Sequence, residues 1–159
     1  MEAVFFNTTM TTAYNLDNPY DLVKKGEWTI DMMLEMSARV KEDLNDDGFY
    51  DTNDQIGLLM GVQAATVLPN TSGSFYITKK SADSYEVTIS TEQNQQIVEK
   101  FVSAINNSSV YYWSTTGGLE DMIKMFSDGK GLFMMNSFEG VSQIRDSSVR
   151  SGSLPFPNY

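Results

Sequence analysis

The sequence predicts an α/β domain, built as an open mixed sheet flanked by helices with a β-hairpin inserted. Apolar runs of strand length alternate with stretches in which apolar residues recur every three or four positions, as in amphipathic helices. Two segments rich in aromatic and β-branched residues flank a short polar turn, which predicts the hairpin. The 159 residues fit a single domain over residues 1–159.

The first part of the chain predicts two strands and three helices. The strands are the apolar runs 3–7 and 56–60, and the second is uninterrupted, as in a strand covered on both faces. The first two helices are short, over 8–14 and 21–25, and Gly26 ends the second. The third begins at Ile30, because Thr29 is a suitable cap and the apolar rhythm continues to Val40.

The middle of the chain predicts a helix, the hairpin and a longer helix. Residues 62–68 are expected to be helical, and a loop is expected from Pro69 onward. The hairpin strands are 75–78 and 85–89, joined through a turn at 80–83. Ser90 and Gln93 have the spacing of a capping box, which predicts the start of a helix that ends near 106–109.

The last part predicts a helix and a buried strand before a polar exit. An aromatic cluster at 110–113 precedes the helix 119–126, and Leu132–Met135 has the composition of a buried strand. Ser137 is expected to cap a helix over about 138–146. Residues 145–153 are expected to be polar loop, and 154–157 extended, since each Pro restrains the residue before it.

Composition narrows the function. The chain carries a net charge of −10 with no His and no Cys. It therefore lacks the Ser-His-Asp triad, thiolate nucleophiles and the common zinc ligands, and we expect it not to be an enzyme. The acidic balance argues against nucleic acid, whose phosphates require Lys and Arg. The apolar strand at the start, with no signal peptide before it, leads us to expect a part of a longer protein.

The segment 43–54 has the spacing of a calcium-binding loop. Oxygen-bearing side chains fall at positions 1, 3, 5, 9 and 12, Gly48 at position 6 permits the sharp turn, and position 7 supplies a backbone carbonyl. The predicted Ca²⁺ ligands are Asp43, Asn45, Asp47, Phe49, Asp51 and Asp54. Position 12 is Asp in place of the longer Glu, so we expect a structural ion and not a switch.

An acidic, solvated turn is the alternative for this loop, since Asn, Asp and Gly all favour turns. Five aspartates lie within the twelve residues 43–54. Their mutual repulsion without a cation favours the calcium interpretation.

Several segments together resemble a known family. Residues 5–7, which precede a predicted short helix, are similar to the family's strand that enters the second lobe. Residues 18–31 are similar to the family's stretch before a long helix. Residues 125–134 resemble its signature F-x-x-G-K-A-A-M, with Gly131 and Leu132 where two small residues are usual, and 154–157 resembles its L-P-x-P strand. With the calcium-type loop, these segments resemble the second lobe of extracellular, family 1, maltose-binding-like solute-binding proteins of bacterial ABC transporters.

This resemblance implies a periplasmic-binding-protein type II lobe, one of two that close on a ligand. It implies capture of a sugar or oligosaccharide outside the cell and delivery to ABC permease subunits, without chemistry. The parent is then expected to be a monomeric cell-surface lipoprotein with its ligand at the ends of the strands, where α/β folds place ligands.

The resemblance implies five ligand contacts, which follow strand ends expected to face the cleft or offer an aromatic face to a sugar. Phe138 stands near the place where many relatives put a Trp against the sugar. Two of the five have other roles open to them, since Trp113 can belong to the core and Ser137 can simply cap a helix. The predicted set is Gln63, Trp113, Asn136, Ser137 and Phe138.

Two other functions remain open at this stage. A calcium-dependent carbohydrate-adhesion or docking module uses the same ligand spacing, but as a short duplicated unit, and this chain has one copy. A glycosidase uses a pair of carboxylates, whereas the aspartates here gather in the loop.

Overall fold

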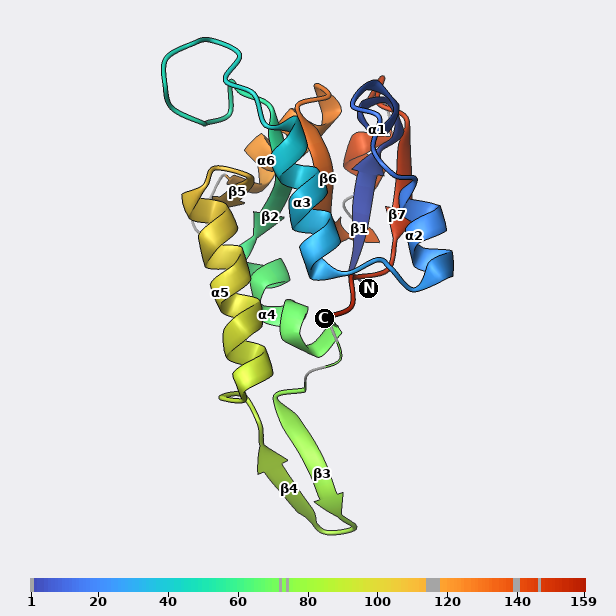
Figure 1. Cartoon of the computed structure of the whole chain (residues 1–159), viewed down its shortest axis with the longest axis vertical. Helices are drawn as coiled ribbons and strands as arrows, with labels where there is room; N and C mark the ends of the chain where they lie inside the picture. The colour runs from blue at the N-terminus through green and yellow to red at the C-terminus, as the bar shows by residue number, and fades with distance from the viewer. Residues whose placement is uncertain (1, 72, 74, 114–117, 139–140, 146) are drawn as a thin grey trace.

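The computed structural model describes residues 2–71, 73, 75–113, 118–138, 141–145 and 147–159. A five-stranded mixed sheet lies between two layers of helices, and a two-stranded hairpin projects away from this body (Figure 1). The predicted α/β fold, an open mixed sheet flanked by helices with an inserted hairpin, is confirmed. None of the helices in the described ranges has the length and apolar content of a membrane span.

The strand order of the sheet is β5-β2-β6-β1-β7. The central strands β2 and β6 run parallel, and β5 is parallel to β2, whereas β1 runs antiparallel to both β6 and β7. The carboxyl ends of β2, β5, β6 and β7 therefore meet the start of β1 at one edge, which we call the carboxyl edge. The strands are β1 (Glu2–Asn7), β2 (Ile56–Gly61), β5 (Val110–Trp113), β6 (Gly131–Ser137) and β7 (Ser151–Leu154).

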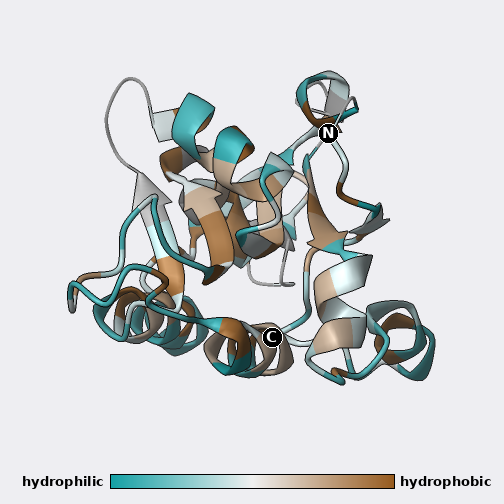
Figure 2. Cartoon of the chain, turned by 90° about the horizontal axis from the view of Figure 1, so that it is seen from above, coloured by the Kyte–Doolittle hydropathy of each residue, from teal (hydrophilic) through white to brown (hydrophobic). Residues whose placement is uncertain are grey.

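Side chains alternate between two apolar cores, one on each face of the sheet. Phe133 and Met135 of β6 enter the larger core, beneath α3 and α5, while Met134 enters the smaller core, beneath α6. Figure 2 shows the brown strands enclosed by helices with teal outer surfaces. The helices are α1 (Thr8–Ala13), α2 (Pro19–Lys25), α3 (Ile30–Val40), α4 (Val62–Thr71), α5 (Glu92–Asn106), α6 (Gly118–Ser127) and α7 (Val141–Ile144).

The third helix packs unusually close to the second strand. A Cβ atom added to Gly57 would lie 2.1 Å from the backbone oxygen of Ser37. Ser37 is fully buried, and its hydroxyl donates to the carbonyl of Met33 at 2.7 Å. Glycine at 57 thus allows α3 to lie directly on the sheet.

Two predicted helix limits are wrong. The cap of α5 is Thr91 and not Ser90, because the Thr91 side chain accepts the N–H of Asn94. The fourth helix continues through Pro69 to Thr71, although a loop was expected from Pro69. The hairpin is also shifted, with β3 at Ile77–Ser81 and β4 at Ser84–Val87, so only residues 82–83 form its turn.

Two further predictions near the carboxyl end are wrong. The α-helix expected over about 138–146 spans only Val141–Ile144 as α7, so Ser137, which is paired with Glu2 as the last residue of β6, is not its cap. The expected polar loop 145–153 ends in a strand, since Ser151–Leu154 hydrogen-bonds along β1 as β7.

Candidate functional site

The loop 43–54 leaves the body as a round turn between α3 and β2, in teal in Figure 1. It leads into the start of β2, so it lies at the opposite end of the sheet from the carboxyl edge. Asp46 and Gly48 take positive φ values of 57° and 81°, which bend the chain where the calcium spacing requires a turn.

Carboxylates close this loop through backbone amides. Asp54 is fully buried, and its two oxygens accept the N–H groups of Leu44 and Asp51, each at 2.9 Å. Asp43 accepts the N–H of Gly48 at 2.9 Å through Oδ2. The predicted first and last ligands thus hold the two ends of the loop together.

The remaining predicted ligands make local turns. Asn45 accepts the N–H of Asp47, Asp47 accepts that of Phe49, and Asp51 accepts that of Asn53. The ring of Phe49 is 74% exposed, as expected for a position that would contribute only its carbonyl. Six positions therefore adopt a compact loop, stabilised by Asx-type hydrogen bonds.

One atom of this loop has no partner. Oδ1 of Asp43 is buried and accepts no hydrogen bond from the described residues. Across the described ranges, no three or more acidic, His or Cys side chains converge closely enough to hold a metal by themselves. A calcium loop also uses amide and backbone oxygens, and here these would come from Asn45 and Phe49. The loop residues fit Ca²⁺ by type and spacing, and the ion stays a prediction.

Two lysines attach the loop to the body. Lys130, just before β6, donates to the carbonyls of Thr52 at 3.2 Å and Asn53 at 2.6 Å. The ammonium of Lys41 lies 4.6 Å from the centre of the Tyr50 ring. These contacts fix the loop relative to the sheet without using the predicted ligand side chains.

The carboxyl edge brings together three segments that are distant in sequence. Register places Glu2 opposite Ser137 and Ala3 opposite Asn136, while Val4 faces Leu154 on the other side of β1. An open depression of about 590 Å³ lies there. Its walls are residues 2–3, Phe138, the segment 153–156 and Asn158. We call it the carboxyl-edge depression.

Phe138 offers an aromatic face to this depression. Its ring is 47% exposed and meets Phe5 edge-on, with centroids 5.6 Å apart. Phe156 contributes a nearly buried ring to the same depression. The predicted aromatic contact is thus anchored against the core on one side and open on the other.

Asn136 precedes this aromatic residue and has an incomplete set of hydrogen bonds. Its Oδ1 accepts the N–H of Ser137 at 2.8 Å, but its buried Nδ2 finds no acceptor among the described residues. A buried amide donor without a partner is destabilising. This feature favours a further contact for the Asn136 amide, such as a bound ligand.

Gln63 and Trp113 have described backbones, at the start of α4 and the end of β5, but their side chains lie outside the described part of the structure. The sequence analysis missed Glu2 and Asn158, which line the depression. Backbone hydrogen bonds of 2.8 and 3.0 Å tie Asn158 to Ile30 and Trp28. The missing signal was the strand pairing that places β1 beside β6, and β7 on the other side of β1.

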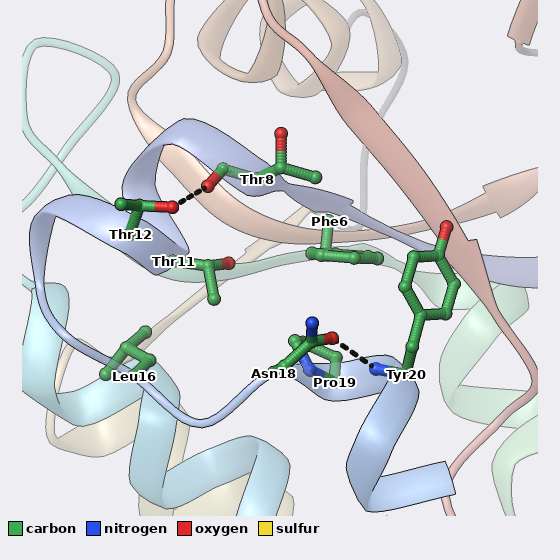
Figure 3. A pocket seen from close by; sticks show the side chains of 8 residues that line it. All are labelled: Phe6, Thr8, Thr11, Thr12, Leu16, Asn18, Pro19 and Tyr20. Carbon is green, nitrogen blue, oxygen red and sulfur yellow. Dashed lines mark hydrogen bonds between the residues drawn. The ribbon is translucent and has the colours of Figure 1, made fainter. Parts of the chain in front are cut away.

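A second pocket, of about 220 Å³, lies at the opposite edge, around α1 (Figure 3). Phe6 and Tyr20 form part of its wall, with ring centroids 5.2 Å apart. The hydroxyls of its three threonines already donate to backbone carbonyls of Arg150, Asn7 and Thr8. Because these donors are occupied within the chain, this pocket is the weaker candidate.

No protein-family model and no curated protein matches this sequence. Solved structures do match its fold. The GacH receptor of Streptomyces glaucescens, solved without ligand and in complex with acarbose, has a TM-score of 0.72 at 14% identity. UspC of M. tuberculosis has a TM-score of 0.68 at 17% identity.

These matches cover 99% of this chain but only 37% of the GacH receptor and 41% of UspC. The chain therefore spans about two fifths of the structures that it resembles. At this identity the likeness concerns the fold, which is that of periplasmic-binding-protein-like structures.

Proposed function

We propose, from this shared solute-binding fold, that the chain is one lobe of a sugar-binding protein and holds its ligand at the carboxyl edge. The observation that carries the proposal is the half-exposed ring of Phe138, fixed over an open depression at that edge. The related GacH receptor, solved with the sugar-type ligand acarbose, supports a carbohydrate as the solute.

The chemistry of the depression suits a sugar. A pyranose presents a flat face of C–H groups that packs on an aromatic ring, and hydroxyls that exchange hydrogen bonds with amides, hydroxyls and carboxylates. The described walls supply Phe138 as the ring, with Glu2, Ser153 and Asn158 as polar neighbours. Glycoside hydrolysis needs two carboxylates, and the described walls contain one, so we propose binding without chemistry.

The wider role is also part of this proposal. The full-length protein would contain a second lobe that closes over the ligand, as the partial coverage of the matched structures suggests. It would work outside the cell and deliver its sugar to ABC permease subunits. Half of the contacts belong to the other lobe in this arrangement, so the isolated chain is expected to bind sugars weakly.

A thermal-shift screen of the full-length protein against mono- and oligosaccharides tests the function, with calcium held constant. A ligand of micromolar affinity at millimolar concentration stabilises by about 4 kcal/mol, which is readily detected. The Phe138→Ala variant should lose most of the shift, whereas Phe49→Ala, which changes an exposed ring in the distant loop, should retain it. No shift with any sugar would contradict the proposal.

We also propose a structural Ca²⁺ in the loop 43–54, held by oxygens of Asp43, Asn45, Asp47, Phe49, Asp51 and Asp54. The buried, unpartnered Oδ1 of Asp43 supports this proposal, because a cation would satisfy it. Chelation with EGTA should lower the melting temperature, and added CaCl₂ should restore it, because an ion bound only to the folded state stabilises that state.

Magnesium at the same concentration is the control, since its preference for octahedral coordination fits this loop poorly. The Asp43→Asn variant should melt at a similar temperature with and without calcium. Equal melting temperatures of the unsubstituted protein under both conditions would exclude the ion.

A further inference from the structure

We propose that Glu2 determines which sugars the carboxyl-edge depression accepts, by taking hydrogen bonds from ligand hydroxyls and repelling anionic sugars. This inference rests on the proposed sugar-binding function and deepens it. It assigns the ligand to the neutral or cationic sugars.

The fold places Glu2 in the wall of the depression. It is the first residue of β1 and lies directly opposite Ser137, the last residue of β6. Phe138 follows at once and lines the same depression. Glu2 and Phe138 thus border the same depression from adjacent segments at the carboxyl edge.

The carboxylate of Glu2 is available for a ligand. It forms no ion pair and accepts no hydrogen bond within the described part of the chain, and its side chain is partly exposed. Both oxygens can therefore accept from two adjacent hydroxyls of one sugar. Such charge-assisted hydrogen bonds are stronger than those between neutral groups.

The same charge limits the class of ligand. Glu2 is the charged residue among the described walls of the depression, and Lys and Arg are absent from those walls. The chain as a whole carries a net charge of −10. An acidic sugar would meet a like charge in the wall of the depression and a negative field around it, which opposes binding. A neutral sugar is not repelled by the Glu2 carboxylate, and the ammonium group of an amino sugar is attracted to it.

The test compares binding of maltotriose, glucose, glucosamine and glucuronate to the full-length protein by titration calorimetry. Glu2→Gln keeps the size of the side chain but removes its charge and one acceptor. We expect it to weaken maltotriose and glucose about 10-fold, as for the loss of a charge-assisted hydrogen bond. Glu2→Gln should also reduce the difference between the affinities for glucosamine and for glucuronate.

Glu35→Gln is the matched control, because it removes one charge from an exposed position on α3. It should leave all four affinities unchanged. If Glu2→Gln fails to fold by circular dichroism, Glu2→Asp retains the charge on a shorter arm, and it should keep the discrimination against glucuronate while weakening the neutral sugars.

The outcomes separate this inference from the function on which it rests. Binding of maltotriose that is weakened by Phe138→Ala but unchanged in Glu2→Gln would overturn the role of Glu2 and leave the function standing. Glucuronate binding as tight as glucose binding to the unsubstituted protein would also overturn it. Failure of every sugar to bind that protein would remove the proposed function and this role together.

Discussion

Gly57 shows how a single residue fixes the spacing of two elements. Its position on β2 leaves no room for a side chain beneath the backbone of Ser37. A methyl group there would push α3 away from the sheet and from a core that includes Met33 and Met36. The atoms that this methyl group would meet belong to the backbone of Ser37, which cannot change rotamer as a side chain can.

Gly57→Ala is therefore expected to destabilise the fold by about 3 kcal/mol or more, measured by urea unfolding. Gly131→Ala is the matched comparison, because its added methyl would meet side-chain atoms of Leu59, the nearest at 2.5 Å. That side chain can shift, so a loss of about 1–2 kcal/mol is expected. Equal losses for the two variants would contradict the close approach of α3.

The cap of α5 gives a second prediction at this scale. Thr91→Ala should lower the free energy of unfolding by about 1 kcal/mol, because the side chain of Thr91 accepts the N–H of Asn94. Ser90 is exposed, so Ser90→Ala should change it by less than about 0.5 kcal/mol. If Ser90→Ala lowered the free energy of unfolding more than Thr91→Ala, Ser90 would be the cap of α5, as the sequence pattern predicts.

These residues also mark how far single-sequence reasoning reaches. Thr29 was identified as a cap and is one, because only one suitable residue precedes the apolar rhythm of α3. At Ser90 and Thr91 two adjacent candidates compete, and propensity does not separate them. The sequence indicated that Asn136 and Phe138 lie at the end of an apolar strand, whereas Glu2 reaches the depression only through pairing with a strand 130 or so residues later.

At the scale of elements, strands held by long-range pairing were the hardest to foresee. The segment Ser151–Leu154 has little intrinsic preference for a strand, and it becomes β7 because β1 offers it backbone partners. The buried strands β2 and β6 were predicted because burial on both faces leaves an uninterrupted apolar run. Local composition thus predicted the central strands of the sheet better than the outer strand β7.

The loop 43–54 depends on the element beside it. Lys130→Met should destabilise the protein by about 1–2 kcal/mol, because the carbonyls of Thr52 and Asn53 lose their donor. Hydrogen exchange should also become faster at the amide of Asp54, which donates to the carbonyl of Asp51.

Lys124→Met is the control for that variant. Lys124 forms an exposed ion pair with Asp128, one turn along α6, and such pairs contribute little. It should change stability by less than about 0.5 kcal/mol and leave exchange in the loop unaltered. If both variants behaved alike, the attachment of the loop through Lys130 would be refuted.

At the scale of the whole molecule, stability is expected to depend on alkaline pH. Burial raises the pKa of Tyr111, with Asp121 and Asp51 adding to the shift, and burial raises the pKa of Tyr76. A raised folded-state pKa means that the folded protein holds the proton more tightly than the unfolded chain. This contribution is complete below the ordinary pKa of 10.0 and is lost as pH rises beyond it.

The melting temperature should therefore fall as pH rises from 9 towards 11. Tyr111→Phe should make this fall shallower, since phenylalanine has no proton to lose, and Tyr76→Phe should act in the same direction. Tyr85→Phe, on an exposed hairpin position, is the control. If the melting temperature of Tyr111→Phe fell with pH as steeply as that of the unsubstituted protein, the raised pKa of Tyr111 would be contradicted.

The position of β1 in the sheet has a consequence during synthesis. Among the strands of this sheet β1 is synthesised before the others, yet both of its neighbours, β6 and β7, are made after residue 130. At about 5–20 residues per second, its apolar side chains wait roughly 6–25 s for partners. The nascent chain would meanwhile expose Val4, Phe5 and Phe6 as an apolar segment that a chaperone could bind. The sheet could form completely only when the last quarter of the domain emerges.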